Sequence, residues 1–220
     1  MILVSDTKYP LAKAYKVASY ILELLQPHCE RIHIAGSIRR MQPQVKDIEI
    51  VCEPKKQIVK RDLLGNETYE TAKEFTQALT TITQQKVKGD TTGRYMQVIT
   101  SSKNCPGIVL DLFMPKPEDY WRQYAIRTGS AEYAHYVIAA AWSRKGWVGI
   151  NGDLYKRSEC QSKMVSGKRV YTIPSPSLRA QRSKLTVPPV WRSEGEFFTW
   201  LDLPYMDPEH RIVSISNEAL

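Results

Sequence analysis

Residues 35–51 have the sequence AGSIRRMQPQVKDIEIV, and this stretch decides the fold. An alternating polar and apolar run over 31–35 predicts a strand, and the pair Gly36 and Ser37 predicts a tight turn that leads into a basic segment. A second strand is predicted over 47–52, where isoleucines alternate with acids. Two strands joined in this way predict a sheet with one buried face and one polar face.

Three acids indicate a metal site. Asp47 and Glu49 lie one residue apart on the second predicted strand, so their side chains leave the same face. Asp111 stands on another apolar strand, where alternation again places the acid opposite the buried side chains. Such carboxylates would repel one another without a cation between them, and oxygen ligands with no His or Cys nearby favour Mg²⁺ or Mn²⁺. Acids on the wet face of a half-buried strand are common, so this pattern alone leaves a solvated face as the alternative.

The turn at Gly36 and Ser37 suits a phosphate group. A strand that enters a Gly-Ser turn exposes backbone N–H groups and a hydroxyl at the start of a helix. Arg40 adds a guanidinium that can bind phosphate through two hydrogen bonds. An ordinary strand-to-helix turn with a basic flank would look the same. The acid pair that begins seven residues after Arg40, at Asp47, makes the combination more specific than either part.

The remaining pattern predicts an α+β fold in two parts. Helical spacing of apolar residues and alternation along short runs predict a mixed sheet with flanking helices. The stretch 115–117, which begins and ends with proline, divides the chain into a first domain, 1–117, and a smaller C-terminal α/β domain, 118–220. The polar stretch 54–66 is assigned no element. The expected helices span 10–25, 69–83, 130–145 with Ser130 as its N-cap, and a short segment after a capping box at Ser193 and Glu196; further strands are expected over 85–88, 94–100 and 108–114.

The charge is unevenly distributed along the chain. The formal net charge is +8, and the segment 156–192 has nine basic residues against one acid. Such a segment can release counterions from several phosphates and so bind a polyanion. Tyr171 and Trp191 within it would either stack on bases or pack in the core, and a solvated basic loop is the alternative for the whole segment. The cations expected to contact nucleic acid are Lys168, Arg169, Arg179, Arg182 and Lys184.

Composition excludes several classes of protein. Of the residues, 42% are apolar and 10% aromatic, so the chain can bury a core and is not expected to be disordered. No apolar run approaches the roughly 20 residues that span a bilayer, and the N-terminus has no signal-peptide pattern. The four cysteines form no CxxC pair, so reduced thiols are expected rather than a zinc site or disulfides. The expected location is the cytoplasm of a bacterium or, for a phage or viral protein, of the infected cell.

Taken together, the motifs resemble those of a known family. AGSIRRMQPQVKDIEIV is similar to the GSxRR and DxD signature of the family X (polymerase-beta-like) DNA polymerases, in the nucleotidyltransferase superfamily. Asp111 in VLDLFMPKPEDYW resembles the third catalytic acid of this family, and Thr128, Gly129 and Ser130 in QYAIRTGSAEY resemble its TGS turn. The closing SEGEFFTWLDLPYMDPEHR is similar to the family's C-terminal end. The matches follow the family order over about 10–211.

The resemblance implies a nucleotidyltransferase palm with a thumb-like subdomain, and a template-directed DNA polymerase for gap filling or repair. Asp47, Glu49 and Asp111 would be the catalytic and metal-binding acids, with Mg²⁺ or Mn²⁺ as the cofactor of a two-metal mechanism. The partners would be primer-template or gapped DNA and a deoxynucleoside triphosphate, bound by a monomer. The resemblance assigns nucleotide binding to Gly36, Ser37, Arg40, Thr128, Gly129 and Ser130.

Some features depart from the family pattern. Glu49 stands where the family usually has Asp, and Ile126 and Arg127 replace a pair that is commonly aromatic. The resemblance begins at the palm, so the lyase and helix-hairpin-helix domains of larger relatives are expected to be absent, and the basic segment 156–192 is expected to grip DNA instead. Two alternatives stay open. One is nucleotide transfer to another acceptor, such as an RNA end, a protein or a nucleotide; the other is a non-catalytic nucleic-acid binder, for which Glu49 is the hint.

Overall fold

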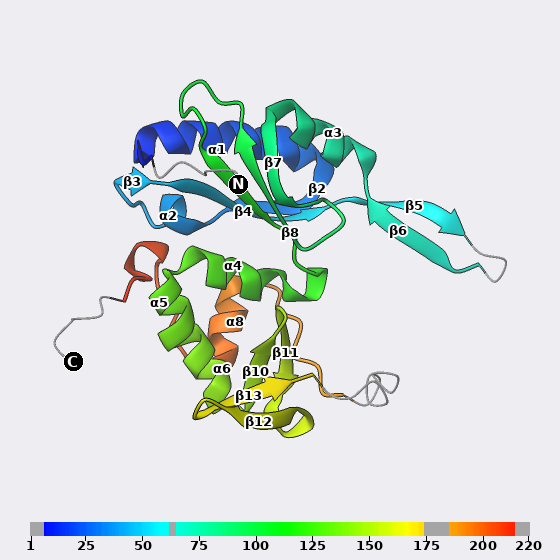
Figure 1. Cartoon of the computed structure of the whole chain (residues 1–220), viewed down its shortest axis with the longest axis vertical. Helices are drawn as coiled ribbons and strands as arrows, with labels where there is room; N and C mark the ends of the chain where they lie inside the picture. The colour runs from blue at the N-terminus through cyan, green and yellow to red at the C-terminus, as the bar shows by residue number, and fades with distance from the viewer. Residues whose placement is uncertain (1–6, 62–64, 174–184, 214–220) are drawn as a thin grey trace.

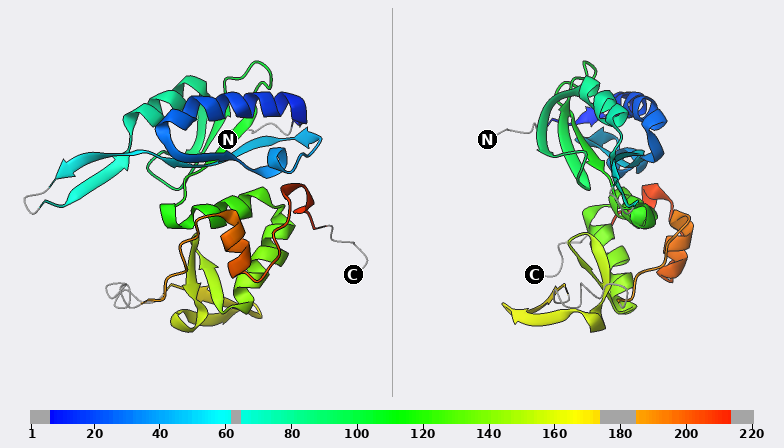
Figure 2. Two further views of the ribbon diagram at one scale, coloured as in Figure 1. Left: turned by 180° about the vertical axis from the view of Figure 1, so that it is seen from behind. Right: turned by 90° about the vertical axis from the view of Figure 1, so that its right-hand side faces the viewer.

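The computed structural model describes residues 7–61, 65–173 and 185–213. Figures 1 and 2 show two lobes, one built around a sheet and the other mostly helical, with β-hairpins extending from both. Each lobe has its own buried hydrophobic cluster, and a smaller cluster lies where the lobes meet. Within the described residues, no helix has the length and apolar character needed to cross a membrane.

A five-stranded sheet forms the first lobe, in the spatial order β2-β4-β9-β8-β7. The central pair β4 and β9 is parallel and the other neighbours are antiparallel, so the sheet is mixed and the predicted α+β class is confirmed. The strands of this sheet are β2 (Cys29–Ile34), β4 (Asp47–Pro54), β7 (Thr83–Gly89), β8 (Tyr95–Thr100) and β9 (Val109–Phe113), and β1 (Tyr9–Pro10) forms a separate short pair with β3 (Gln44–Val45).

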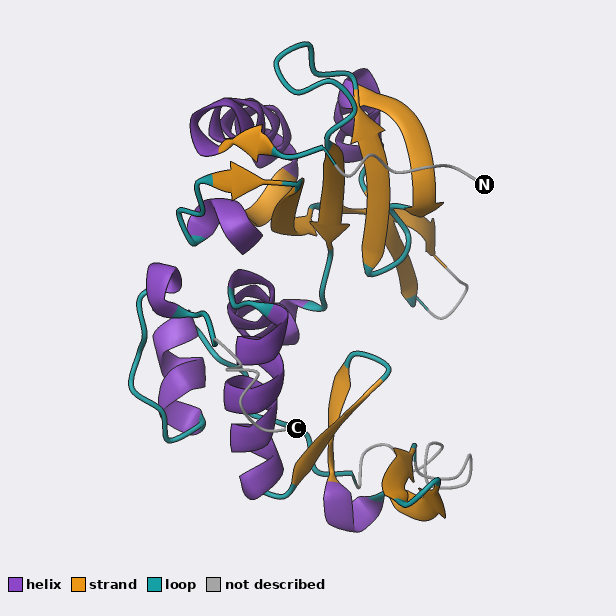
Figure 3. Cartoon of the chain, turned by 60° about the vertical axis from the view of Figure 1, so that its left-hand side comes forward, coloured by secondary structure: helices purple, strands orange, loops and turns teal. Residues whose placement is uncertain are grey.

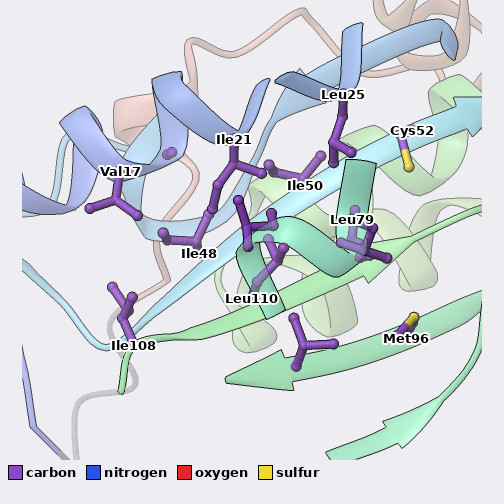
Figure 4. Close-up of a cluster of buried hydrophobic side chains, with 14 of the residues drawn as sticks. Val17, Ile21, Leu25, Ile48, Ile50, Cys52, Leu79, Met96, Ile108 and Leu110 are labelled. Carbon is purple, nitrogen blue, oxygen red and sulfur yellow. The ribbon is translucent and has the colours of Figure 1, made fainter. Parts of the chain in front are cut away.

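Two helices cover one face of the sheet. α1 (Leu11–Leu25) and α3 (Lys73–Ile82) present apolar residues at helical spacing to it. Figure 4 shows Ile48, Ile50 and Leu110 of the central strands packed with residues of both helices. Because side chains alternate along a strand, the acids that lie between these residues leave the opposite face. The apolar face of the sheet therefore forms the core, and its polar face remains open to the second lobe.

A β-hairpin replaces part of a predicted helix. The sequence predicted a helix over 69–83 and no element over 54–66, but a two-stranded hairpin occupies most of this region and α3 begins after it. The prediction was wrong because the apolar residues at helical spacing begin only at Phe75, whereas Tyr69 faces Ile58 across the hairpin. The two strands are β5 (Lys56–Arg61) and β6 (Glu67–Thr71).

The second lobe begins with α4 (Tyr120–Thr128), which contacts both β4 and the last helix. The sequence did not predict α4, because its buried side chains include Arg122 and Thr128 and its apolar spacing is weak. Ser130 caps the next helix as predicted, since its Oγ accepts the Tyr133 N–H at 3.1 Å. That helix consists of α5 (Ala131–Tyr133), a π-helical segment (Ala134–Ala139) and α6 (Ala140–Arg144).

The rest of the second lobe contains four strands and a last helix: β10 (Trp147–Ile150), β11 (Asp153–Lys156), β12 (Gln161–Val165), β13 (Lys168–Thr172) and α8 (Glu194–Trp200). Short 3-10 turns lie in both lobes, at Gln26–His28, Pro117–Asp119, Arg157–Glu159 and Pro208–His210.

An aromatic cluster forms the core of the second lobe. Trp191 is 4% exposed, and its ring centroid lies 4.9 Å from Phe197 and 5.1 Å from Trp200. Of the two roles that the sequence left open for Trp191, the structure supports the core, and stacking on nucleic acid is excluded by burial. The predicted N-cap is present, because the Ser193 Oγ accepts the Glu196 N–H at 3.1 Å; the Glu196 carboxylate accepts the N–H of Arg192, one residue before the position expected for a full capping box.

One buried carboxylate joins the two lobes. Glu194 accepts two hydrogen bonds from Arg39 of the first lobe, at 2.9 and 2.8 Å. It accepts two more, at 2.5 and 3.1 Å, from Arg211, whose side chain is fully buried, and one from the Tyr205 hydroxyl at 3.2 Å. Although burial acts to raise it, the hydrogen bonds from the two arginines hold the pKa of Glu194 below its usual value. The network therefore keeps an ionised carboxylate between two cations in the interior.

We expect Glu194→Gln to destabilise the protein by about 3–5 kcal/mol, because it leaves the buried guanidinium of Arg211 and the half-buried guanidinium of Arg39 without their counterion. Thermal unfolding should show a fall in Tm on the order of 10 °C. The matched control is Glu196→Gln on the same helix, whose carboxylate pairs with the exposed Arg192 and whose loss should cost less than about 1 kcal/mol. Equal Tm values for the two variants would show that the buried network does not hold the lobes together.

Candidate active site

The three acids singled out in the sequence lie on the polar face of the sheet. β4 and β9 run parallel with Glu49 directly opposite Asp111, and Asp47 stands two residues before Glu49 on the same strand. Residues opposite one another in neighbouring strands share a face, as do residues two apart on one strand. The register therefore gathers three carboxylates, which are distant in sequence, on the side of the sheet that faces the second lobe.

Burial and the charges of neighbouring acids make Glu49 and Asp47 harder to ionise. Burial, followed by the charges of Asp47 and Asp111, raises the pKa of Glu49 to about 7. Burial and then the charge of Asp111 also raise the pKa of Asp47. Arg127 and Arg40 act on Glu49 in the opposite direction without outweighing these effects. A cation that entered this cluster would relieve the repulsion and favour the ionised carboxylates.

The donor set fits a hard divalent ion. Carboxylate oxygens are the ligands that Mg²⁺ and Mn²⁺ prefer, and the described lining of the cleft in front of Glu49 contains no His or Cys. The Tyr95 hydroxyl and the Gln97 Nε2, at 2.8 Å, both donate to Oδ1 of Asp111, which leaves its Oδ2 for another partner. Among the residues that the structure describes, no three acidic, His or Cys side chains already form a metal cage. Binding an ion would therefore have to draw the carboxylates closer together.

The Gly-Ser turn approaches the acids directly. It lies in the single helical turn α2 (Gly36–Arg39), where Gly36 has a φ of +61° and a Cβ atom would stand 1.9 Å from Oε2 of Glu49. Only glycine fits both the left-handed backbone and this close approach. Within the described part of the chain, the Ser37 Oγ and the Arg40 Nε are buried without a hydrogen-bond partner. Buried polar atoms normally have partners, so this turn presents two groups that a ligand can satisfy.

The TGS turn lies against the same motif. Arg39 Nη1 donates to the Thr128 Oγ1 and Arg40 Nη1 donates to the Thr128 carbonyl, both at 2.6 Å. At Gly129 a Cβ atom would stand 2.7 Å from the ring of Tyr133, so the turn packs tightly on the helix that follows. The structure thus brings together two of the motifs that the sequence singled out, through the side chains of both arginines.

A cleft of about 600 Å³ opens in front of the acids. Glu49 and Asp111 line it from the sheet, Arg127 lines it from α4, and the turn at Asn151 and Gly152, between β10 and β11, lines it from the second lobe. The cleft is large enough for a nucleotide-sized ligand, because small-molecule sites are typically about 300–1,000 Å³. Its walls combine carboxylates with cations, which suits a ligand that carries both metal ions and phosphates.

A second contact between the lobes borders this cleft. Arg94, at the start of β8, donates to both oxygens of Asp153 at 2.9 and 3.0 Å, and Lys116 donates to Asp153 at 3.1 Å. Together with the bonds between Arg39 and Glu194, these ion pairs fix the spacing of the two lobes at two separate places. The width of the cleft is therefore set by side-chain pairs and not by backbone connections alone.

Sequence reasoning missed the groups that support the acids. Tyr95 and Gln97 alternate along β8 on the polar face, a signal visible in the sequence, but their pairing with Asp111 depends on a strand register that the sequence does not show. Arg127 was noted only as a departure from the family. In the structure its guanidinium lies 4.0 Å from the ring centre of Phe113 and beside the acid cluster. Arg127 lines the cleft itself, whereas Arg40 lies at the end of the Gly-Ser turn.

Other predicted residues stand elsewhere. The Ser130 Oγ is used in capping its own helix, so a sugar contact would have to come from another atom of the turn. Lys168 and Arg169 are exposed on β13, in the hairpin at the end of the second lobe far from the sheet (Figures 1 and 3). Tyr171 on the same strand is half-buried. The remaining predicted nucleic-acid contacts, Arg179, Arg182 and Lys184, lie outside the described residues.

Comparison with known proteins adds a structural similarity. The fold is similar to that of polymerase beta from Leishmania infantum in its ternary P/T complex, with a TM-score of 0.62 and a sequence identity of 17%. The similarity covers 94% of this chain and 77% of that one. The chain has a polymerase-beta-like fold. At this identity the similarity shows the fold alone; no protein-family model matches the sequence, and no curated protein does.

We expect Glu49→Gln to raise the free energy of unfolding at pH 8 in the absence of metal. Since the pKa of Glu49 rises from 4.5 to about 7 on folding, the folded state binds the proton more tightly, and stability is lost as pH rises between these values. At pH 8 the neutral variant should therefore be more stable by roughly 2–3 kcal/mol, or about 5 °C in Tm. Thermal unfolding at pH 5 and pH 8 checks this, and the difference should shrink at pH 5.

The same experiment includes metal. MnCl₂ should raise the Tm of the wild type at pH 8 and should raise that of Glu49→Gln much less, because the variant has lost one ligand. Glu53→Gln is the matched control on the same strand: its carboxylate pairs with Arg31, so it should lose stability and keep the response to metal. A Glu49→Gln variant that is less stable than the wild type at pH 8 would contradict this description of the acid cluster.

Proposed function

We propose that this chain is a template-directed DNA polymerase of the family X type, which adds a deoxynucleotide to a primer 3′-hydroxyl in gap filling or repair. The observation that carries the proposal is the gathering of three carboxylates beside the Gly36 turn, where Ser37 and Arg40 hold buried polar atoms without described partners. The polymerase-beta-like fold and the collinear motifs support it. Residues 1–117 would form the palm and residues 118–220 the thumb-like subdomain.

In the proposed reaction the primer 3′-oxygen attacks the α-phosphorus of the triphosphate. A new O–P bond forms, the bond from phosphorus to the pyrophosphate oxygen breaks with its electron pair going to pyrophosphate, and the hydroxyl proton passes to water. Asp111 would face the primer end, with Asp47 and Glu49 toward the triphosphate. Mg²⁺ or Mn²⁺ held by the three acids would lower the pKa of the hydroxyl and neutralise the leaving pyrophosphate. Tyr95 and Gln97 would keep the Asp111 carboxylate in a fixed orientation through their two hydrogen bonds.

One cation at the Gly-Ser turn and another in the cleft would position the triphosphate. Arg40 is fixed by its bond to the Thr128 carbonyl, so the rest of its guanidinium is oriented before a ligand binds. Ser37 would donate its hydroxyl to a phosphate oxygen. Arg127, held over the ring of Phe113, offers a further positive charge on the opposite wall. Such preorganised donors act without reorganisation when charge develops on the phosphate oxygens.

A second candidate is nucleotide transfer to an acceptor other than DNA, such as an RNA end, a protein or another nucleotide. One observation favours it: the described cations predicted to grip DNA, Lys168 and Arg169, lie on the hairpin far from the cleft. Labelled nucleoside triphosphates offered without DNA separate this candidate from the first. A product that forms only on a primed template supports the polymerase.

Asp111→Asn tests the proposed function. Single-nucleotide extension of a primed template with Mg²⁺ or Mn²⁺ should fall by on the order of a thousandfold, equivalent to about 4 kcal/mol of lost transition-state stabilisation. DNA binding, measured by fluorescence anisotropy, should remain. Asp202→Asn is the control, since this acid is exposed and pairs with Lys145 of the second lobe. The proposal fails if the wild type extends no primer, or if Asp111→Asn extends it as fast as the wild type.

Tyr95→Phe tests the support of Asp111. Loss of one hydrogen bond to the carboxylate should lower kcat about tenfold, which corresponds to roughly 1.4 kcal/mol, and leave the KM for the nucleotide within about twofold. The reason is that Tyr95 orients the acid and holds no phosphate in this proposal. Tyr15→Phe, on the exposed side of α1, should change neither constant. A change confined to KM would instead place Tyr95 in substrate binding.

A further inference from the structure

The β5–β6 hairpin projects from the first lobe as a separate arm (Figures 1 and 2). Its strands pair only with each other, and most of its side chains are exposed. A two-stranded hairpin is marginally stable by itself, so apolar residues on its surface require an explanation. Ile58 is 51% exposed and Tyr69 is 56% exposed, although both are large and apolar.

The exposed pair occupies one face of the arm. Ile58 lies directly opposite Tyr69, and Lys56 stands two residues before Ile58 on the same strand, so these side chains share a face. A bulge after Ile58 brings Arg61 opposite Glu67, which is two residues from Tyr69 and therefore on this face as well. We call Lys56, Ile58, Arg61, Glu67 and Tyr69 the arm face. It places one aromatic ring and one aliphatic side chain between two cations.

The tyrosine ring is held in place for contact. The Tyr69 hydroxyl donates to Glu67, and Glu67 also pairs with Arg61. This anchors the edge of the ring and leaves its surface accessible. The ion pair is exposed, with the Arg61 side chain 66% accessible, and such pairs open at little cost when a better anion approaches. Over the hairpin sequence 56–71, the cations Lys56, Lys60 and Arg61 equal the acids Asp62, Glu67 and Glu70 in number, so attraction for an anion would come from where the cations stand and not from a net charge of the arm.

The base of the arm face, at Lys56, lies near the junction of the lobes. Lys56 lines a depression of about 420 Å³ together with Arg94 and Lys116, and Arg94 also lines the candidate active site. The opposite face of the arm looks toward α3, because Gln57 and Val59 line a different depression with residues of that helix. A strand that left the cleft past Arg94 would therefore reach Lys56 first and could continue along the strand to Ile58 and Tyr69. Four acids lie along this route, and three of them are neutralised by cations. Glu53 pairs with Arg31, Asp119 with Arg122, and Asp153 with Arg94 and Lys116. The fourth acid is Glu30.

We propose that the arm face binds the unpaired template strand as it leaves the active-site cleft. The proposal rests on the proposed polymerase function for the origin of that strand. Cations that flank an exposed aromatic ring suit a single strand, because the cations follow its phosphates while the ring stacks on an unpaired base. A duplex offers no free base surface to Tyr69, and two flanking cations match a polyanion better than an apolar protein surface. The arm extends the grip on DNA beyond the cleft.

The test measures binding of DNA by the full chain, without nucleotide, by fluorescence anisotropy. The probes are a primer-template with a 5′ single-stranded overhang of about ten nucleotides and the same duplex with blunt ends. Tyr69→Ala should weaken binding of the overhang substrate about tenfold and leave the blunt duplex unchanged. Tyr69→Phe should retain most of the affinity, since stacking needs the ring and not the hydroxyl. Tyr20→Ala, which removes an exposed tyrosine of α1, is the matched control.

Salt dependence supplies a second measurement. Lys56→Gln should reduce the slope of log K against log salt by about 0.7 for the overhang substrate, as expected for one lost contact to a single-strand phosphate. The proposal is overturned if Tyr69→Ala binds the overhang as the wild type does, or weakens both substrates equally. It is also overturned if the wild type sediments as a dimer that Tyr69→Ala dissociates, because a second copy then covers the face. If Tyr69→Ala weakens binding of the overhang substrate but the wild type extends no primer, the arm face remains a site for single-stranded DNA. That result would refute only the proposed polymerase function.

Discussion

The relative position of the two lobes depends on the hydrogen bonds that the Glu194 carboxylate accepts. This carboxylate lies between Arg39, beside the Gly-Ser turn, and Arg211, near the end of the described chain, and the partners Arg39 and Glu194 are separated by 155 positions in the sequence. Arg39 also holds the Thr128 hydroxyl, and the neighbouring Arg40 holds the Thr128 carbonyl. The two motif turns and the second lobe are thus fixed relative to one another by charged hydrogen bonds, which are stronger than neutral ones.

The acid cluster works against stability in the same region. Glu49 contacts the Gly36 turn and lies opposite Asp111 on the neighbouring strand. Its raised pKa reflects the free energy needed to ionise its carboxyl at this position. Structures that keep such unfavourable groups commonly do so at sites that bind ligands. The Ser37 Oγ and the Arg40 Nε, which have no hydrogen-bond partner among the described residues, belong to the same region. The hydrogen bonds of the Glu194 network hold these groups in place.

The sequence predicted the parts of the site that are local and missed those that depend on pairing. The alternation of polar and apolar residues placed Asp47, Glu49 and Asp111 on the polar faces of their strands, because this pattern can be recognised within each strand's own sequence. It gave no access to the contacts of Tyr95 and Gln97 with Asp111, since these depend on which strands become neighbours. For the same reason α4, whose buried face includes arginine and threonine, was not predicted, and the β5–β6 arm was taken partly for a helix. Local patterns also could not show that Trp191, within a basic segment, packs in the core.

Anomalous diffraction from crystals grown with Mn²⁺ and a non-hydrolysable deoxynucleoside triphosphate is the most direct measurement of the central claim. We expect manganese peaks between the carboxylates of Asp47, Glu49 and Asp111, two of them roughly 3.5–4 Å apart when a primer end is present. The triphosphate should lie against Ser37 and Arg40. Manganese bound away from these acids, or a nucleotide bound outside the cleft with Ser37 still unpartnered, would contradict the claim that the sheet's polar face is a site for metal-dependent nucleotide transfer.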